Sequence, residues 1–310
     1  MNFSLDAEVR TVIVQCTSLL VDAGIARDAG ITDAFQARAV CEHEVKLLLT
    51  EACGIGMNKL DTSILMRDRV GTITDEESLV RFGLWLERRL AREPLQHITG
   101  HAPFRYLDLE VGPGVFVPRP ETEILIDEVI SYIQHRCLQR PLIVDLCAGS
   151  GALGLAAATE INSSTVKAVE ISEEAIAYTR RNAERVSAKN YEVILGDAAD
   201  AQTYVGLNGS VDVVISNPPY VPERDIPTQV ETRDFDPEIA LYGGSSDGMH
   251  IPRLIIQRAN TLLKPGGLLV MEHDWQQGQQ TCEAASVTGF SVTMTKKDLA
   301  GKDRYLYAIK

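Results

Sequence analysis

The chain has 310 residues, a formal net charge of -13 at pH 7, 45% hydrophobic residues and 24% charged residues. These proportions are those of a folded globular protein, and the length allows one large domain or two ordinary ones. The strong negative charge argues against general binding of nucleic acid, which needs clustered lysine and arginine. No apolar run of about 18 residues could span a membrane, and the N-terminus lacks the features of a secretion signal. We therefore expect a cytoplasmic protein that binds neither membranes nor nucleic acid directly.

The cysteines and histidines form no metal-binding pattern. The six cysteines are scattered without a CxxC pair, which is typical of reduced thiols rather than of a disulfide framework or a zinc site. His97 and His101 lie four residues apart, but Gly100 between them breaks the helical face that a metal-binding pair needs. We expect no metal.

The first 93 residues predict a small helical bundle. Apolar residues recur at three- and four-residue spacing in segments 7–24, 33–54 and 74–93, and the first two segments run into a glycine. The third segment begins with Thr74 and ends before Pro94. It has acidic residues in its first turn and arginines in its last, as the helix dipole prefers.

The composition changes between residues 94 and 120, which are rich in glycine and proline. Residues 104–111, FRYLDLEV, alternate between apolar and polar side chains, and the following GPG turns the chain into VFVP. This pattern predicts a β-hairpin that links the bundle to a second domain over residues 121–310.

Strands and helices alternate strictly in the second domain. Strands are predicted at 142–147, 165–171, 191–197, 211–216 and 267–273, and helices at 151–160, 173–187 and 252–263. Such alternation, with strands rich in valine and isoleucine, is typical of a parallel sheet covered on both faces. The last two predicted strands, 290–298 and 303–310, are joined by so few residues that only an antiparallel pair is possible. The predicted fold class is therefore α/β, with a seven-stranded Rossmann-like sheet.

A glycine-rich loop follows the first strand of this sheet. Gly149, Gly151 and Gly154 have the spacing of a dinucleotide-binding loop, and Glu170 lies about 20 residues further on. An NAD-dependent oxidoreductase is a candidate on this motif alone. Glu170 ends the second strand, where it can accept both hydroxyls of a ribose, and S-adenosylmethionine (SAM) has a ribose too.

Three features favour SAM over NAD. Asp145 lies four residues before Gly149, where a carboxylate can face the ammonium group of the cofactor or the amides of the loop itself. Asp197 ends the third strand, where its carboxylate can accept the amino group of adenine. The antiparallel closing pair is typical of SAM-dependent methyltransferases, whereas dehydrogenases usually continue in parallel. Loop capping is the alternative role for each aspartate.

The fourth strand ends on Asn217-Pro218-Pro219-Tyr220, and two adjacent prolines cannot donate to a ladder of hydrogen bonds. The prolines either simply terminate the strand or build a rigid site for a planar NH₂ group. In the second interpretation the Asn217 oxygen and the Pro218 carbonyl accept the two N–H groups, and Tyr220 packs on the flat face. These bonds stabilise positive charge growing on the nitrogen and aim it at the methyl group of SAM. Adenine, cytosine and glutamine amides all qualify as substrates.

Five segments of the chain carry a family resemblance: REPLQHITGHAPFRYLDLEVGPGVFVPRPETE, DLCAGSGALG, NPPYV, GSSDGM and LLVMEHDWQQG. In this order they resemble segments of the release-factor glutamine methyltransferases, the PrmC (formerly HemK) family. The resemblance implies methyl transfer from SAM to the glutamine side-chain amide in the Gly-Gly-Gln motif of class I peptide-chain release factors. It implies a docking bundle over residues 1–93, a hairpin linker over 94–120 and a SAM-dependent domain over 121–310. Nothing in the sequence indicates oligomerisation, so we expect a monomer.

The expected site residues follow from the motifs and the resemblance together. The expected cofactor-binding residues are Asp145, Cys147, Ala148, Gly149, Ser150, Gly151, Glu170, Asp197, Ala198 and Asn217. The residues expected to hold the glutamine are Asn217, Pro218, Pro219 and Tyr220, with Asn217, Pro218 and Tyr220 as the catalytic ones. The residues expected to shape the pocket mouth are Arg119, Glu121 and Glu123.

The chain departs from the family pattern in three places. Cys147-Ala148 stands where many members have Gly-Thr, and Ala198 stands where some members place an aromatic residue against the adenine. The bundle matches only loosely, which leaves its docking residues unassigned.

Three other functions remain as alternatives. Ribosomal-protein glutamine methyltransferases typically read VPRSP where this chain reads VPRPETE. Adenine-specific nucleic-acid methyltransferases share the NPPY-type tetrapeptide, but they need a basic target-recognition region, which is not expected in so acidic a chain. A non-catalytic scaffold that binds the translation machinery has no physical need for Asn217 followed by two prolines.

Overall fold

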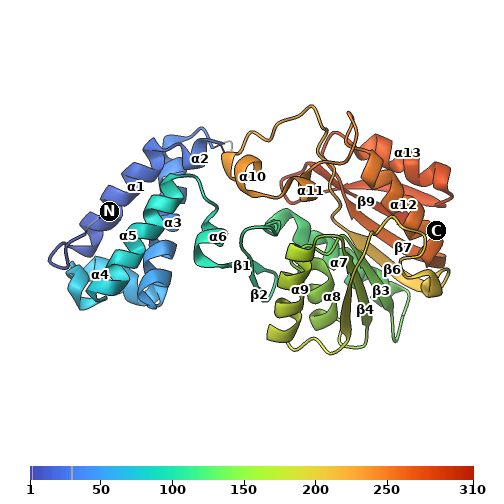
Figure 1. The fold of residues 1–310 in the computed structure, drawn as a ribbon, viewed down its shortest axis with the longest axis horizontal. Coiled ribbons are helices and arrows are strands. Elements are labelled where there is room, and N and C mark those ends of the chain that lie inside the picture. The colour runs from blue at the N-terminus through green and yellow to red at the C-terminus, as the bar shows by residue number, and fades with distance from the viewer. Residues whose placement is uncertain (2, 29–30) are drawn as a thin grey trace. The chain divides into compact units, whose positions relative to one another are not determined.

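The computed structural model describes residues 1, 3–28 and 31–310. This part of the chain divides into two compact units. Unit 1 combines Met1–Gly100 with Pro227–Phe235, and unit 2 combines His101–Ile226 with Asp236–Lys310 (Figure 1). A short stretch from the second half of the chain therefore belongs with the N-terminal helices.

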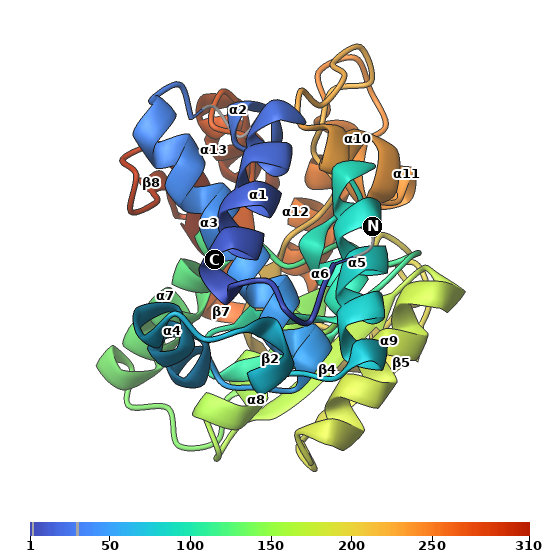
Figure 2. The same cartoon turned by 90° about the vertical axis from the view of Figure 1, so that its left-hand side faces the viewer.

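Unit 1 is helical, as predicted. Its helices are α1 (Val9–Asp22), α2 (Ile25–Asp28), α3 (Ala34–Cys53), α4 (Met57–Met66), α5 (Glu76–Leu90), α6 (Leu95–Thr99) and α10 (Val230–Phe235), with a 3₁₀ turn at Val70–Thr72. The three longest, α1, α3 and α5, run beside one another (Figure 2). They correspond to the three predicted helices, and their apolar sides enclose a core in which Cys16, Leu48 and Phe82 are fully buried.

Local signals explain where these helices begin and end. Asp33 caps α3 by accepting an amide hydrogen of its first turn at 2.8 Å. Gly54 ends the same helix with a φ of 62°, a left-handed conformation that favours glycine. Asp75 caps α5 in the same way as Asp33 caps α3. Helix α5 therefore begins one residue later than predicted, because the Asp75 carboxylate and not the Thr74 hydroxyl reaches the free amide.

Unit 2 is built on a seven-stranded sheet in the order β5-β4-β3-β6-β7-β9-β8. The strands are β3 (Leu142–Leu146), β4 (Thr165–Glu170), β5 (Tyr191–Leu195), β6 (Val211–Ser216), β7 (Leu263–Glu272), β8 (Val292–Lys297) and β9 (Asp303–Ile309). β3 to β7 pair in parallel, whereas β9 runs antiparallel to both β7 and β8. The predicted fold class, an α/β sheet closed by an antiparallel pair, is confirmed. β7 begins at Leu263, four residues before the predicted strand.

Helices cover both faces of this sheet (Figure 1). They are α7 (Ile124–His135), α8 (Ala152–Glu160), α9 (Glu173–Arg185), α12 (His250–Leu262) and α13 (Gly278–Thr288). Unit 2 also contains a short helix, α11 (Glu238–Leu241). Successive residues of β3 face two different cores, because side chains alternate along a strand. Ile143 packs in the core that contains α7 and α8, and Val144 and Leu146 pack in the core that contains α12 and α13. Neither α7 nor α13 is among the predicted elements, although α7 carries apolar residues at helical spacing.

A β-hairpin lies in the predicted region and belongs to unit 2, but the prediction placed its turn wrongly: the chain turns at Arg105 and Tyr106 and not at GPG, and residues 115–118 form no strand. The hairpin consists of β1 (His101–Phe104) and β2 (Leu107–Glu110), which pair antiparallel. Phe104 and Leu109 are fully buried in the core shared by α7 and α8. The hairpin is therefore packed against the sheet domain by its own apolar side chains. No helix in the described part of the chain is both long and apolar enough to cross a membrane.

One fully buried side chain joins the hairpin to the loop after β3. Asn182 of α9 accepts the amide hydrogen of Glu110 at 2.7 Å and donates to the Glu110 carbonyl at 3.0 Å. It also donates to the carbonyl of Ser150 at 3.0 Å. The hairpin and the glycine-rich loop thus share one hydrogen-bonding partner.

Candidate active site

Four neighbouring parallel strands end at the same edge of the sheet. Leu146 lies opposite both Val169 and Ser216, and Ser216 lies opposite Met271. The next residue of each strand therefore lies at this edge, and these residues are Cys147, Glu170, Asn217 and Glu272. In open α/β sheets, ligands bind at the carboxyl ends of the strands.

The loop 147–151 leads from β3 into α8 and depends on two glycines. Gly149 has a φ of 59°, and a side chain there would meet nothing within 4 Å. The loop backbone therefore faces open space at this point and can approach a ligand closely. At Gly154, by contrast, a Cβ would lie 2.6 Å from Tyr191 and 2.8 Å from the Asp145 carboxylate. The last glycine of the motif thus lets α8 pack against the sheet.

Asp145 is fully buried near the end of β3. Its Oδ2 accepts the amide hydrogen of Gly154 at 2.9 Å, and its Oδ1 has no hydrogen-bond partner among the described residues. Burial raises the pKa of Asp145 to about 7, although the Gly154 hydrogen bond opposes this rise. Of the two roles expected for Asp145, binding an amide of the loop and its helix is the one with a contact in the structure.

Glu170 ends β4, and each of its carboxylate oxygens has one backbone donor. Oε2 accepts the amide hydrogen of Gly149 at 2.7 Å, and Oε1 accepts that of Ser172 at 2.8 Å. Burial raises the pKa of Glu170. Since a carboxylate oxygen can accept two hydrogen bonds, each oxygen has capacity for one more donor. This capacity matches the two neighbouring hydroxyls of a ribose.

Asp197 and Ala198 follow β5 at the next strand end. Asp197 is exposed, and its Oδ1 accepts the amide hydrogen of Ala199 at 2.8 Å. Ala198 is buried in the core that contains Leu146 and Val169. The Ala199 bond is the capping role considered above, and the exposed Asp197 carboxylate stays the predicted acceptor for an adenine amino group.

Cys147 has a backbone conformation that favours glycine. Its φ is 73°, in the left-handed region that few non-glycine residues occupy. Burial raises the pKa of the Cys147 thiol, and the nearby Glu170 charge raises it further. The thiol is therefore protonated at neutral pH and serves as a small filler beside the loop, since a reactive cysteine needs a lowered pKa.

The tetrapeptide Asn217-Pro218-Pro219-Tyr220 follows β6 and carries two hydrogen-bond acceptors, the Asn217 carboxamide oxygen and the Pro218 carbonyl oxygen. Ser216 donates its hydroxyl to the Leu146 carbonyl, which ties the end of β6 to β3. Within the residues that the structure describes, neither the Asn217 carboxamide nor the Pro218 carbonyl has a hydrogen-bond partner. An amide oxygen and a carbonyl oxygen on a rigid backbone are what a planar NH₂ group needs.

Tyr220 is held through its hydroxyl by a buried carboxylate. The hydroxyl donates to Glu272 Oε1 at 2.9 Å, and the Thr122 hydroxyl donates to Glu272 Oε2 at 2.6 Å. Burial raises the pKa of Glu272, which is only 2% exposed, and also raises the pKa of Tyr220. The two hydroxyl donors offset part of the cost of burying the carboxylate. The hydrogen bond to Glu272 also restricts the orientation of the Tyr220 ring within the tetrapeptide.

The main chain of Tyr220 is held by a third segment. Gln277 Nε2 donates to the carbonyl oxygens of Tyr220 and Asp247, each at 2.9 Å. Asp247 lies in GSSDGM and Gln277 lies in EHDWQQG, two of the segments that carry the family resemblance. Both segments therefore help to fix the tetrapeptide.

Three residues of this arrangement are absent from the predicted site: Thr122, Glu272 and Gln277. Glu272 and Gln277 lie in the segment LLVMEHDWQQG, which carries the family resemblance. The resemblance marks this segment but assigns no role to either residue. Tyr220 and Glu272 are 52 residues apart in the sequence, and no local pattern connects them.

The three charged residues expected at the pocket mouth differ in their surroundings. Arg119 donates to Asp236 Oδ2 at 2.6 Å, and burial raises the pKa of Asp236 to about 6 in spite of this partner. Glu123 accepts the backbone amide hydrogen of Arg105 at 2.9 Å, so it is engaged by the hairpin turn. Glu121 is exposed. Their role at a pocket mouth stays a prediction.

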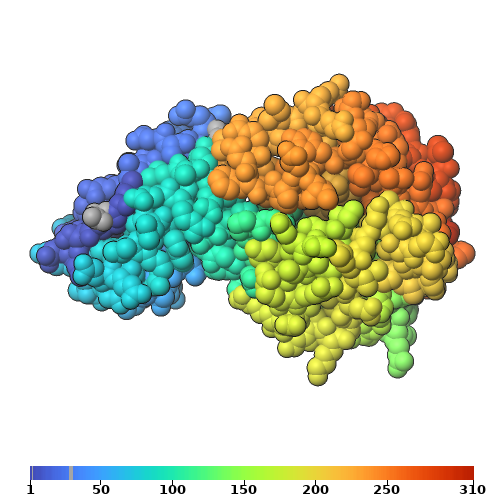
Figure 3. All heavy atoms as spheres, in the orientation of Figure 1, coloured from blue at the N-terminus to red at the C-terminus, as the bar shows by residue number. Residues whose placement is uncertain are grey.

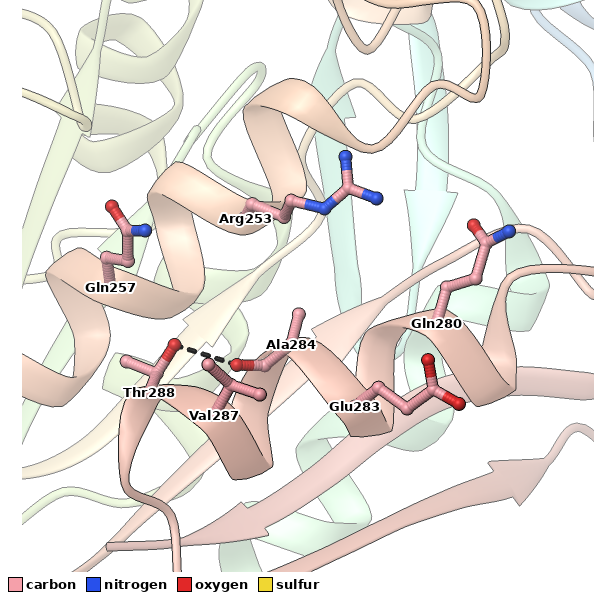
Figure 4. A pocket seen from close by; sticks show the side chains of 7 residues that line it. All are labelled: Arg253, Gln257, Gln280, Glu283, Ala284, Val287 and Thr288. Atoms are coloured by element: carbon pink, nitrogen blue, oxygen red, sulfur yellow. Dashed lines mark hydrogen bonds between the residues drawn. The ribbon is translucent and has the colours of Figure 1, made fainter.

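A separate groove lies between α12 and α13 (Figure 4). It is lined by Arg253, Gln257, Gln280, Glu283, Ala284, Val287 and Thr288. None of these residues belongs to the strand-end site. Over the described residues, no three His, Cys, Asp or Glu side chains are grouped so as to hold a metal ion.

Replacing Gly154 with alanine should lower the free energy of unfolding by about 1–3 kcal/mol, the usual cost of overpacking a filled interior. The new methyl group would lie too close to Tyr191 and Asp145. Urea unfolding measures the change, and Gly206→Ala is the matched control because its Cβ would meet nothing within 4 Å. Equal stability of the two variants would contradict the close packing of α8.

Replacing Asp145 with asparagine should change how stability depends on pH. The folded-state pKa of Asp145 is raised from 3.8 to about 7, so its contribution to stability is complete below about pH 4 and is lost as the pH rises toward 7. Asp145→Asn has no proton to lose there, so its stability relative to the parent should increase over this interval by about 4 kcal/mol. Denaturant unfolding of both proteins across this pH range measures the difference. A difference that does not vary with pH would mean that Asp145 titrates normally.

Comparison with known proteins places this geometry in a family. A model described as a methyltransferase domain matches residues 142–308, and a model described as the PrmC N-terminal domain matches residues 31–100. The chain is 48% identical to the release factor glutamine methyltransferase of Bifidobacterium longum, over 97% of this chain and 99% of that protein. It is 41% identical to the protein of the same name from Streptomyces coelicolor, over 96% of each chain.

A differently named relative also matches. The chain is 36% identical to the 4-amino-L-phenylalanine/4-methylamino-L-phenylalanine methyltransferase of Streptomyces pristinaespiralis, over 84% of this chain and 80% of that protein. The identity to the first two relatives is higher and extends over nearly the whole of each chain. The resemblance drawn from the sequence is confirmed, and the chain belongs to the release factor glutamine methyltransferase family.

Proposed function

We propose that this chain transfers a methyl group from SAM to the side-chain amide nitrogen of the glutamine in the Gly-Gly-Gln motif of class I peptide-chain release factors. The observation that carries the proposal is the pair of acceptors at Asn217 and Pro218, which have no partner in the described part of the chain. A primary amide has two N–H groups in one plane, and it fits two such acceptors. The names of the first two relatives support the same substrate.

The residues at the strand ends fit the proposed cofactor. Glu170 has capacity for two ribose hydroxyls, and Asp197 offers an exposed carboxylate to the adenine amino group. The open side of Gly149 allows close approach of the ligand to the loop backbone. The other residues that we assign to the cofactor site are Asp145, Cys147, Ala148, Ser150, Gly151, Ala198 and Asn217. When bound, SAM supplies a methyl group on a positively charged sulfur.

The residues of the tetrapeptide would carry the reaction by positioning and electrostatics. An amide nitrogen is a poor nucleophile because its lone pair is delocalised. The Asn217 oxygen accepts one N–H and the Pro218 carbonyl accepts the other, so that positive charge growing on the nitrogen is stabilised. The two prolines restrict the backbone that carries these acceptors, and Tyr220, bound to Glu272, packs on the flat face of the amide. The methylated nitrogen then loses its proton to solvent without needing a side chain as base.

The relative from Streptomyces pristinaespiralis raises a second candidate substrate. Its name specifies an amino group on an aromatic ring, which is also planar and fits two acceptors. The match of residues 31–100 to the PrmC N-terminal domain favours the protein substrate. We assign docking of the release factor to residues 1–93, the linker to 94–120 and catalysis to 121–310, in a cytoplasmic monomer that binds no nucleic acid directly.

Methyl transfer from labelled SAM to a purified class I release factor tests the proposal. The same factor with its Gly-Gly-Gln glutamine changed to alanine is the control for the target atom. DNA, a ribosomal protein fraction and free 4-amino-L-phenylalanine are assayed in parallel. We expect label on the unchanged release factor alone. Label on one of the other substrates instead would retain the chemistry of the tetrapeptide and overturn the substrate.

Replacing Asn217 with alanine should lower kcat by a factor on the order of 100, about 3 kcal/mol in the barrier, by comparison with the loss of one oxyanion-hole donor. The rate is measured with SAM and release factor both saturating, so that weaker binding does not contribute. Asn162→Ala, at an exposed position of unit 2 between α8 and β4, is the matched control. A loss smaller than about tenfold would exclude this role for Asn217.

A further inference from the structure

The segment that follows the tetrapeptide leaves unit 2 and returns to it. Before the segment, the amide of Val221 donates to the Leu241 carbonyl at 2.8 Å, and the Val221 carbonyl accepts the amide hydrogen of Gly243 at 2.9 Å. After it, Asp236 accepts a hydrogen bond from Arg119 at 2.6 Å. The stretch between these two anchors, residues 222–235, is therefore held at both ends within unit 2.

The middle of this stretch belongs to unit 1 and is attached there by a carboxylate. Glu231 of α10 receives two hydrogen bonds from Arg92, Nε to Oε1 at 2.9 Å and Nη2 to Oε2 at 2.7 Å. Arg89 donates from Nη1 to Glu231 Oε1 at 2.8 Å, and from Nε to Glu44 Oε2 at 2.7 Å. We call these four residues the Glu231 clamp. It joins α10 to α3, to α5 and to the residues just after α5.

The clamp is shielded from water, so its charges depend on one another. The Arg89 side chain is 5% exposed, that of Arg92 is 13% exposed, and those of Glu231 and Glu44 are 17% exposed. Burial alone would raise the pKa of Glu231, but the hydrogen bonds from Arg92 and Arg89 hold this pKa below its usual value. Removing one partner of such a pair leaves an uncompensated charge in a poorly hydrated place.

The clamp is also the main feature that distinguishes α10 from a surface turn. No residue of α10 is fully buried, so this helix has no apolar anchor of its own. Residues 223–226 are exposed and form part of the surface seen in Figure 3. The amide of Glu223 donates to the Ser245 carbonyl at 3.1 Å, so fixing Glu231 leaves residues 224–230 between two held positions, and a shorter loop has fewer conformations.

We propose that Glu231 is a positioning residue for methyl transfer, acting through the loop 222–230 that follows the Asn217–Tyr220 tetrapeptide. Arg89 and Arg92, by this inference, fix the C-terminal end of the loop that follows the tetrapeptide. A preformed loop spares the protein substrate the cost of ordering it on binding. The inference rests on the proposed function, because it names a determinant of how the protein substrate is received.

Glu231→Gln tests the proposal, since it keeps the shape of the side chain and removes its charge. Asp234→Asn is the matched control: Asp234 lies in the same helix, and its partner Arg233 is exposed. Hydrogen exchange of the amides of residues 223–226 and 228–230 is measured first, without substrate. We expect faster exchange in Glu231→Gln and unchanged exchange in Asp234→Asn. Equal exchange in all three proteins would overturn the proposal, whatever happens to activity.

Kinetics with the release factor give the second readout. Glu231→Gln should raise KM for the release factor roughly tenfold, because the loop must now be ordered on binding. We expect kcat to change much less and the affinity for SAM to stay the same. Glu231→Gln added to Arg92→Gln should cause little further loss, since the two residues form one unit. If Glu231→Gln has an unchanged KM and a lower melting temperature, the clamp stabilises unit 1 and has no positioning role.

The two hypotheses fail in different ways. If the unaltered protein does not methylate the release factor, the proposed function fails, and the exchange experiment still decides whether Glu231 restrains the loop. If the unaltered protein is active and Glu231→Gln matches it in both exchange and KM, only the positioning role fails. Should Glu231→Gln fold poorly, Arg92→Lys keeps the charge and loses the paired hydrogen bonds, and it should show the same change in smaller measure.

Discussion

The alignment of four parallel strand ends is the constraint on which the rest of the site depends. Leu146, Val169, Ser216 and Met271 lie side by side in the register, so the residue after each arrives at one edge of the sheet. Those residues are a thiol, two carboxylates and a carboxamide, and they are distant in sequence. A shift of one residue in any strand would turn its last side chain to the opposite face of the sheet. The register of the sheet therefore brings the chemical groups of the site together, and no single loop does so.

Three buried carboxylates at this edge are held in different ways. Asp145 and Glu170 bind backbone amides of the glycine-rich loop and its surroundings, whereas Glu272 binds the hydroxyls of Thr122 and Tyr220. Burial raises the pKa of all three. Each carboxylate therefore loses contact with water and accepts hydrogen bonds that fix a neighbouring segment. The first two shape the loop proposed for the cofactor, and the third orients the ring proposed to lie on the substrate amide.

Sequence patterns predict the strands and helices, whose side chains recur at regular spacing. They do not predict contacts between residues that are distant in the sequence. The five parallel strands follow from their apolar runs, rich in valine and isoleucine, and the antiparallel closing pair follows from its short connection. The role of Glu272 was not predictable, because a carboxylate beside a phenol 52 residues away leaves no local pattern. Helix α7 is not among the predicted elements, although its apolar residues recur at helical spacing. The place of α10 in unit 1 depends on Arg89 and Arg92. From the sequence alone, these arginines are predicted only to form the basic C-terminal end of a helix.

The division of unit 1 between two stretches of sequence limits how the chain can be rearranged. An N-terminal fragment ending at Gly100 would contain Arg89 and Arg92 but not Glu231, the carboxylate that they share. The apolar core of unit 1 lies within this fragment, yet Arg89 and Arg92 would lose the hydrogen bonds that Glu231 accepts from them. A chimera that joins the N-terminal helices of one relative to the sheet domain of another would face the same mismatch wherever residues 89, 92 and 231 differ. Recombination within the family is therefore expected to carry these three positions together, and not to exchange the two domains at the hairpin as independent modules.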